Sequence, residues 1–260
     1  MLLAIDVGNT NIVFGLFDGG NLVAKFRTST HGGRTADEIG LLINQFCGTF
    51  GFQLGAIETA VVGSVVPQVM YTLNHALDKY VKCPVRIVGA DLPIPLENLC
   101  EEPLGIDRAV TGIAAMRMYG KPVVVIDFGT ATKFDAFSGS GAYLGGLICP
   151  GIQISMDALF TKAAALPRIE IKKPRRVIGV NTVGQMQAGA VFGFVGSVEG
   201  VVAGIKRELE VENLPIVATG GLAQLISEHT PAIGYVDRNL TLHGLRLVWE
   251  TRQQKRGDGY

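Results

Sequence analysis

Two aspartates, Asp6 and Asp127, occupy matching positions in two similar segments of the chain. Residues 2–17 read LLAIDVGNTNIVFGLF, and residues 123–137 read VVVIDFGTATKFDAF. In each segment an apolar run leads into Asp-x-Gly, small hydroxyl or amide residues follow, and a second apolar run begins. An acidic side chain at the end of a buried strand is costly unless it has a partner. We therefore expect each carboxylate to meet a cation, a bound water or backbone amides.

The residues after each aspartate can bind phosphate. Gly8 and Gly129 permit a tight turn, and the exposed N–H groups and hydroxyls of residues 8–11 and 129–132 can contact phosphate oxygens. The neighbouring carboxylate can then hold a hydrated Mg²⁺. One such segment could be an ordinary hairpin turn, but two in matching contexts favour nucleotide or phosphate handling.

Composition narrows the class of protein. With 260 residues, 48% of them hydrophobic, the chain can form one large domain or two small ones. The 23 basic and 23 acidic residues balance, and no basic stripe indicates a nucleic-acid partner. The nearest candidate, KKPRR at 172–176, is best explained as a solvated loop, with phosphate contact as the alternative.

Cysteine usage and the N-terminus favour a cytoplasmic location. The four cysteines are widely spaced without a C-x-x-C pair, which predicts reduced thiols. Met1 leads directly into a strand pattern, without the pattern of a signal peptide. The apolar stretch 188–205 contains Glu199 and is followed by Lys206 and Arg207, so we expect no membrane span.

The periodicity predicts two α/β halves, 1–118 and 119–260. The predicted strands are 2–5, 12–17, 22–28, 59–62, 85–88, 123–127, 132–137, 141–148 and 215–218, and the predicted helices are 35–50, 68–80, 105–119, 153–163, 182–209, 222–227 and 241–251. Each half begins with a hairpin and continues as α/β. This pattern predicts a duplicated actin-like (ribonuclease H-like) ATPase fold, with the halves flanking a nucleotide cleft. Neither a P-loop nor a Rossmann glycine motif is present.

Five glycines form a stripe on the predicted helix 182–209. They recur at spacings of three and four residues: Gly189, Gly193, Gly196, Gly200 and Gly204. Such a stripe allows another helix to approach closely, either within the chain or across a dimer.

Several motifs in this order resemble the type III pantothenate kinase family over about residues 2–250. They are DVGNTN at 6–11, GIDR at 105–108, DFGTAT at 127–132, GGLICPG at 145–151, Asn181-Thr182 and TGG at 219–221. The resemblance implies ATP-dependent phosphorylation of pantothenate to 4′-phosphopantothenate, the first step of coenzyme A biosynthesis. It also implies Mg-ATP, a monovalent cation (potassium or ammonium) and a homodimer.

The resemblance also implies a role for each matching residue. Asp107 would be the general base, Asp6 would place the magnesium, and Asp127 would bind the monovalent cation. The ATP-binding residues would be Asp6, Val7, Gly8, Asn9, Thr10, Asn11, Ile12, Val13 and Thr130, with Thr219–Gly221 near the nucleoside. The pantothenate-binding residues would be Gly105, Ile106, Asp107, Arg108 and Thr182.

The chemistry of phosphoryl transfer asks for these residue types. A primary alcohol is a poor nucleophile, so a carboxylate such as Asp107 should orient it and take its proton. Asp107 stands at a predicted helix start, which favours the ionised form, although an ordinary helix-start acid would look the same. The Arg108 guanidinium suits either a carboxylate or a phosphate.

Three positions depart from the family pattern. Asn98 stands where members often have tyrosine, Lys133 where threonine is usual, and Val180 where many have lysine. Lys133 can pair with a phosphate or with Asp135. We find no physical account of the change at Val180.

Two other functions compete with the kinase. A non-catalytic relative acting as a transcription accessory factor would be expected to lose Asp6, Asp107 or Asp127, and all three are present. A sugar kinase or exopolyphosphatase of the same fold would need a longer chain or a basic channel.

Overall fold

The computed structural model describes residues 1–30 and 33–257, and the side chains as far as residue 254. The described chain forms two compact units. The first contains residues 1–96 and 102–114 and the segment that begins at Leu240, and the second contains 97–101 and 115–239. The helix after Leu240 thus packs with the first sheet. The division of the duplicated fold into halves 1–118 and 119–260 stays a prediction.

The first unit is built on a five-stranded sheet of order β3-β2-β1-β4-β5. Its strands are β1 (Leu2–Val7), β2 (Asn11–Asp18), β3 (Asn21–Ser29), β4 (Thr59–Ser64) and β5 (Val85–Ile87). β1 pairs antiparallel with β2 and parallel with β4. Its helices are α1 (Ala36–Thr49), η1 (Leu54–Ala56), α2 (Pro67–Ala76), the π-helical turn η2 (Leu77–Val81) and α7 (Leu240–Gly257). Helix α3 (Ile106–Tyr119) begins in this unit, and its residues from Ala115 belong to the second.

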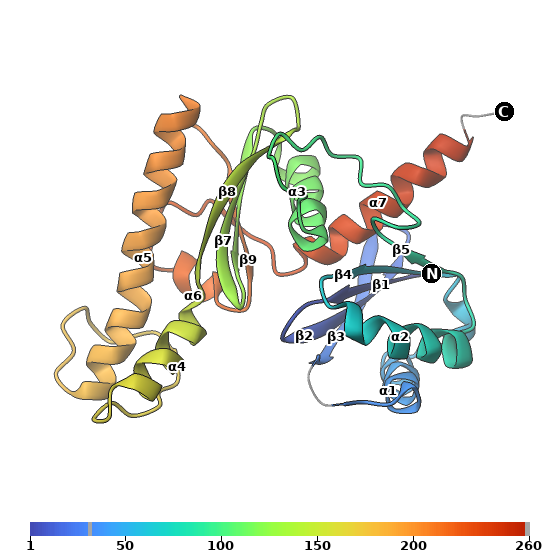
Figure 1. Cartoon of the computed structure of the whole chain (residues 1–260), viewed down its shortest axis with the longest axis horizontal. Helices are drawn as coiled ribbons and strands as arrows, with labels where there is room; N and C mark the ends of the chain where they lie inside the picture. The colour runs from blue at the N-terminus through green and yellow to red at the C-terminus, as the bar shows by residue number, and fades with distance from the viewer. Residues whose placement is uncertain (31–32, 258–260) are drawn as a thin grey trace. The chain divides into compact units, whose positions relative to one another are not determined.

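Helices cover both faces of this sheet (Figure 1). Leu3 and Ile5 of β1 face α1 and α2 and share a buried cluster with Ile43 and Leu73. Ala4, between them, faces the other way, into a cluster with residues of α3 and α7. A strand buried on both faces is apolar at consecutive positions, which explains the run that precedes Asp6.

The second unit repeats this topology. Its sheet has the order β10-β9-β6-β7-β8, with strands β6 (Val123–Phe128), β7 (Ala131–Phe137), β8 (Tyr143–Pro150), β9 (Ile216–Gly220) and β10 (Tyr235–Val236). β6 pairs antiparallel with β7 and parallel with β9, as β1 does with β2 and β4. Its remaining helices are α4 (Ile152–Lys162), α5 (Thr182–Leu209) and α6 (Ala223–Ser227). The shared strand order confirms the predicted duplicated fold.

Helix α5 is continuous over 28 residues despite its glycines. Val191, Val195, Val198 and Val202 pack against the second sheet. By length and composition alone this helix could cross a membrane, a test that core helices of soluble proteins also pass. A Cβ placed on any of the five stripe glycines would meet no atom within 4 Å beyond its own helix. Of the two alternatives for this stripe, close packing within the chain does not occur among the described residues, and contact across a dimer stays a prediction.

The local signals explain most element boundaries. Thr35 caps α1 with a capping box, in which its hydroxyl accepts from Glu38 N and the Glu38 carboxylate accepts from Thr35 N. The predicted helix 68–80 instead ends as α2 at Ala76 and continues as the π-helical turn. The two-residue strand β10 was too short to be predicted.

Candidate active site

The first predicted phosphate segment forms a tight turn at the end of β1. Gly8 N donates to Asn11 O at 3.0 Å, which closes the turn. The Thr30 hydroxyl donates to Gly8 O at 2.6 Å, and Thr30 N donates to Thr10 O at 3.0 Å. Asn9 and Thr10 are exposed at its tip. A side chain at residue 8 would crowd Asn11 O, with a Cβ only 3.2 Å away, so the turn favours glycine.

The predicted ATP-binding residues divide by burial. Val7 and Ile12 are buried in the core of the first unit, so only their backbone can contribute to ligand binding. Asp6 is half-buried at the penultimate position of β1. It lies opposite Val13 on β2 and Gly63 on β4.

The start of α3 lies beside these strand ends. A Cβ on Gly63 would lie 3.3 Å from Ile106 Cγ2, so Ile106 packs directly over the residue that neighbours Asp6. The structure therefore brings the Gly105–Arg108 segment and the Asp6 strand together within the first unit. Asp107 and Arg108 are half-buried in the first turn of α3. Ligands commonly bind at the carboxyl ends of parallel strands such as β1 and β4.

Gly105 sits against the carboxylate of Asp107. A Cβ at residue 105 would lie 2.8 Å from Asp107 Oδ1, closer than side-chain carbons normally approach. The Thr111 hydroxyl donates to Asp107 O and Arg108 O, both at 2.9 Å, which anchors the backbone of the same turn. Sequence reasoning missed this dependence of the Asp107 side-chain position on glycine at residue 105.

The second phosphate segment forms a matching turn at the end of β6. Gly129 N donates to Ala131 O at 3.2 Å, and Thr130 is exposed. Gly151 N donates to Thr130 O at 3.2 Å, and a Cβ on Gly151 would lie 2.3 Å from the same oxygen. Gly220, at φ +93°, backs closely onto Phe128. Three sequence motifs, at 127–132, 145–151 and 219–221, thus meet at one end of the second sheet.

Asp127 is paired with a lysine. Lys133 Nζ lies 3.0 Å from Asp127 Oδ2, and the two residues lie directly opposite each other on β6 and β7. Neither sequence alternative, a phosphate or Asp135, included this ion pair. The hairpin supplies the missed signal: Phe128 pairs with Thr132 across the turn, so the next pair outward is Asp127 with Lys133.

The remaining predicted positions, Thr182, Asn98 and Val180, are all exposed. Thr182 is exposed at the start of α5, where the Asn181 side chain accepts from Gly184 N at 2.8 Å. Asn98 is exposed, and its Oδ1 accepts from Cys100 N at 3.0 Å. Val180 is 70% exposed. The described contacts do not bring Thr182 to the Asp127 turn.

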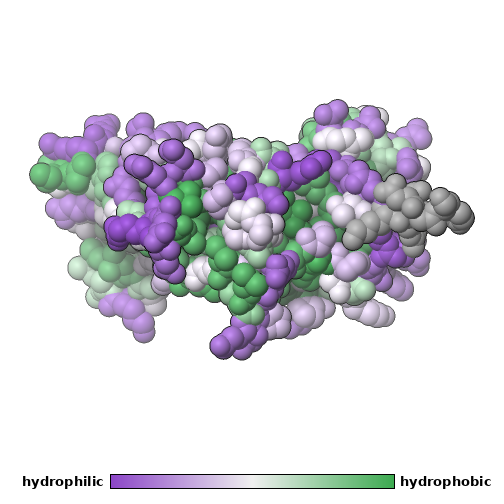
Figure 2. Space-filling view, turned by 90° about the horizontal axis from the view of Figure 1, so that it is seen from above, coloured by the Kyte–Doolittle hydropathy of each residue, from purple (hydrophilic) through white to green (hydrophobic). Residues whose placement is uncertain are grey.

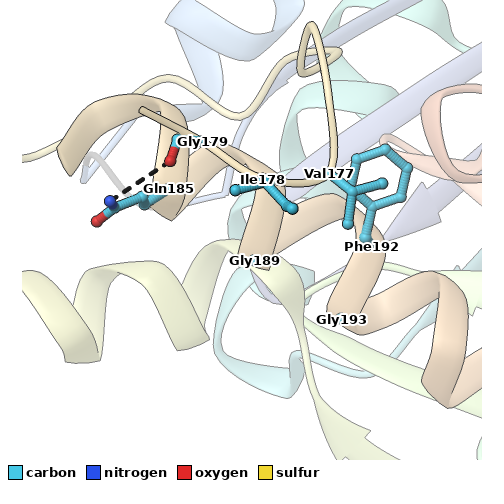
Figure 3. Close-up of a pocket in the computed structure, with 8 residues that line it drawn as sticks. Val177, Ile178, Gly179, Gln185, Gly189, Phe192 and Gly193 are labelled. Atoms are coloured by element: carbon cyan, nitrogen blue, oxygen red, sulfur yellow. Dashed lines mark hydrogen bonds between the residues drawn. The ribbon is translucent and has the colours of Figure 1, made fainter. Parts of the chain in front are cut away.

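A hydrophobic hollow lies beside the start of α5 (Figure 3). Val177 and Ile178 line it together with Phe192 and the stripe glycines Gly189 and Gly193. Val177 is 64% and Ile178 80% exposed, and the hollow carries few polar groups. Gln185 Nε2 donates to Gly179 O at 3.5 Å at its edge. Figure 2 shows a face of the molecule on which hydrophilic residues and apolar areas are interspersed.

A duplicated fold whose two sheets each carry an aspartate and a glycine turn at the same strand end defines the class of actin-like ATPases and kinases. Solved structures agree with this fold. An activator of 2-hydroxyisocaproyl-CoA dehydratase from Clostridium difficile, with bound ADPNP, superposes with a TM-score of 0.55 at 13% identity, covering 98% of this chain and 97% of that one. A Campylobacter jejuni protein of the Baf transcriptional activator family gives 0.58 at 19% identity, covering 97% and 99%.

Sequence comparison identifies the particular family. The family model for type III pantothenate kinase matches residues 2–204. The type III pantothenate kinase of Moorella thermoacetica is 47% identical over 254 residues, covering 96% of this chain and 99% of that protein. That of Brevibacillus brevis is 46% identical over 255 residues, covering 97% and 100%. The chain belongs to the type III pantothenate kinase family, and the predicted family assignment is confirmed.

Proposed function

We propose that this chain transfers the γ-phosphoryl group of ATP to the primary hydroxyl of pantothenate, with Asp107 as the general base. Membership of the family supports the reaction, which yields 4′-phosphopantothenate and ADP at the first step of coenzyme A biosynthesis. The structural observation that carries the residue assignment is the packing of the α3 start over Gly63, next to Asp6.

The Asp6 turn is the proposed site for the ATP phosphates. Exposed Asn9 and Thr10 and the backbone of residues 7–13 offer donors to phosphate oxygens. A contact between Thr130 and ATP stays a prediction from the family resemblance. Asp6 supplies a hard oxygen ligand, which fits a divalent ion such as Mg²⁺ that binds through few carboxylates plus substrate phosphates. When bound, that ion would neutralise charge on the transferring group.

Asp107 is suited to the base role by its position. Its carboxylate lies in the first turn of α3, where the helix dipole favours a negative charge. A carboxylate within hydrogen-bond reach of the pantothenate hydroxyl can orient it and accept its proton as the new P–O bond forms. We assign Arg108 to an anionic group of a substrate, and Gly105 and Ile106 to the pantothenate site; the role of Thr182 stays a prediction from the family resemblance.

Asp127 does not match the expected site for a free monovalent cation. Its Oδ2 is already paired with the Lys133 ammonium, which supplies a positive charge at this position. The predicted binding of potassium or ammonium by Asp127 is untested, this ion pair argues against it, and we derive no step through such an ion.

The homodimer also stays a prediction, supported by the exposed surface of α5. The five stripe glycines face open space, and Val177, Ile178 and Val180 are exposed near the start of the same helix. A second copy of the chain covering this surface would bury apolar area that is otherwise wet. We further propose a cytoplasmic enzyme with pantothenate and ATP as its partners, and neither nucleic acid nor membrane.

The Asp107→Asn variant tests the base assignment. The change is nearly isosteric, so the fold should persist while kcat falls by about 10²-fold or more, in line with the loss of a general base. The matched control is Asp78→Asn, which removes an exposed carboxylate from the η2 turn of the same unit. Wild-type kcat in Asp107→Asn would remove Asp107 from this role.

A further inference from the structure

We infer that the Lys133 side chain takes the place of a monovalent cation at Asp127, so that this enzyme carries its own tethered ammonium. The inference rests on the proposed kinase function, because it concerns the cation that the family resemblance implies. It makes Lys133 a positioning residue that acts through the Asp127 carboxylate.

The geometry of the pair supports a built-in cation. Because Asp127 and Lys133 are direct cross-strand partners, both side chains leave the sheet on the same face. Their charged atoms lie 3.0 Å apart, and the side chains are only 27% and 16% exposed. Most surface ion pairs are more exposed and contribute little, whereas a covered pair is screened much less by salt.

A second carboxylate, Asp135, lies on the same face of the sheet and also stabilises the positive charge of Lys133. Asp135 lies two residues further along β7, so it shares the face of Lys133. This carboxylate is 1% exposed, and Tyr143 Oη donates to its Oδ1 at 3.3 Å. Without Lys133, the half-buried Asp127 carboxylate would lose this ion pair on the same face as the buried Asp135. Burying such charges uncompensated is costly.

The Asp127 turn leaves a free ion at a disadvantage. A Cβ on Gly129 would lie 3.5 Å from both oxygens of Asp127, an ordinary contact distance, so the turn lies beside this carboxylate. A potassium ion at Asp127 Oδ2 would compete with Lys133 Nζ, which lies 3.0 Å from that oxygen and whose side chain is only 16% exposed. The tethered ammonium is already held by the chain, so it binds without the loss of translational freedom that a free ion incurs.

A lysine ammonium and a potassium ion share the properties that a cation beside Asp127 needs. An alkylammonium is a compact single positive charge, and its three N–H donors can each meet an oxygen. Thr132, on the opposite face of β7, and Thr130, in the turn, cannot supply this charge. The chain therefore requires no external monovalent cation at Asp127 for the electrostatic role.

The test compares wild type with Lys133→Thr, which restores the residue usual at this position. Each protein is assayed for pantothenate-dependent ADP release in potassium, sodium or choline chloride at equal ionic strength. Potassium binding is measured separately by calorimetry and by the shift of the thermal midpoint. The matched control is Lys79→Thr, which removes a lysine paired at 2.7 Å with Asp37 on the surface of the other unit.

The inference predicts two linked results. Wild-type kcat should agree within about twofold among the three salts, and potassium should neither bind nor raise the midpoint selectively. Lys133→Thr should lose about tenfold or more in choline, because a charge contact is missing, and potassium should restore the rate and raise the midpoint. Lys79→Thr should behave as wild type.

Three outcomes would overturn it. Wild-type turnover that collapses without potassium, or selective potassium binding by wild type, would show that Lys133 does not replace the ion. A Lys133→Thr variant with raised KM for ATP and no potassium rescue would place Lys133 on a phosphate instead. If that variant does not fold, the wild-type titrations still decide. Absence of pantothenate-dependent ADP in every salt would refute the proposed function, while the binding measurements would still test the cation inference.

Discussion

Replacing Gly105 by alanine should separate catalysis from stability. The added Cβ would lie 2.8 Å from Asp107 Oδ1, whereas ordinary contacts begin at 3.4 Å. The carboxylate is the far end of a side chain, so it can move away by about 0.6 Å while the backbone stays in place. A 1 Å misplacement can cost about 10²-fold in rate, so a shift of this size should lower kcat by about tenfold.

The stability of the same variant should not fall. Gly105 is not among the glycines with positive φ, so alanine fits its backbone. Reducing the freedom of the unfolded chain should raise the free energy of unfolding by about 0.4–1 kcal/mol. Urea unfolding and ADP-release kinetics measure the two effects. The control is Gly55→Ala, where a Cβ meets nothing within 4 Å.

Two results would refute this reasoning. If kcat of Gly105→Ala stayed within about twofold of wild type, the position of the Asp107 carboxylate would not limit the reaction. If the variant instead lost more than about 2 kcal/mol of stability, the added methyl group would be disturbing the backbone rather than the carboxylate.

Three further substitutions test single contacts. Thr30→Val removes the hydroxyl that donates to Gly8 O at 2.6 Å. The variant should raise KM for ATP by about fivefold (about 1 kcal/mol) without changing KM for pantothenate. Equal changes in both KM values would contradict a role of Thr30 in the phosphate turn. Thr35→Ala breaks the α1 capping box and should cost about 1 kcal/mol in urea unfolding with kcat unchanged; an unaltered midpoint would show the cap to be dispensable. Gly63→Ala places a Cβ 2.8 Å from Leu245 Cδ2 and should lower the free energy of unfolding by about 1–3 kcal/mol through overpacking. An unchanged free energy of unfolding would mean that helix α7 shifts to make room for the added methyl group.

The duplicated fold was predictable because its signals are local and occur twice. The apolar runs before Asp6 and Asp127 are buried strands in both units, and the glycine turns follow them as expected. Helix α5 begins and ends where the pattern predicted, at Thr182 and Leu209. Its glycines face outward, so they weaken the helix without interrupting its buried valines.

The features that could not be predicted from the sequence depend on contacts between segments. The ion pair of Lys133 with Asp127 follows from hairpin register, and a lysine next to several acids does not reveal its partner. The closeness of Gly105 to Asp107 depends on a side-chain rotamer at the start of α3. The support of the first turn by Thr30 joins residues 22 positions apart. The grouping of α7 with the first sheet arises from packing of Leu242 and Leu245, which periodicity alone does not direct to either half.

The most direct test of the central claim is the identity of the product. Purified protein is incubated with Mg-ATP and pantothenate, and phosphopantothenate and ADP are quantified together by mass spectrometry. The account predicts that both form in equal amounts, that neither forms without pantothenate, and that Asp107→Asn suppresses both. ADP produced at the same rate without pantothenate, or no phosphopantothenate under any condition, would contradict it.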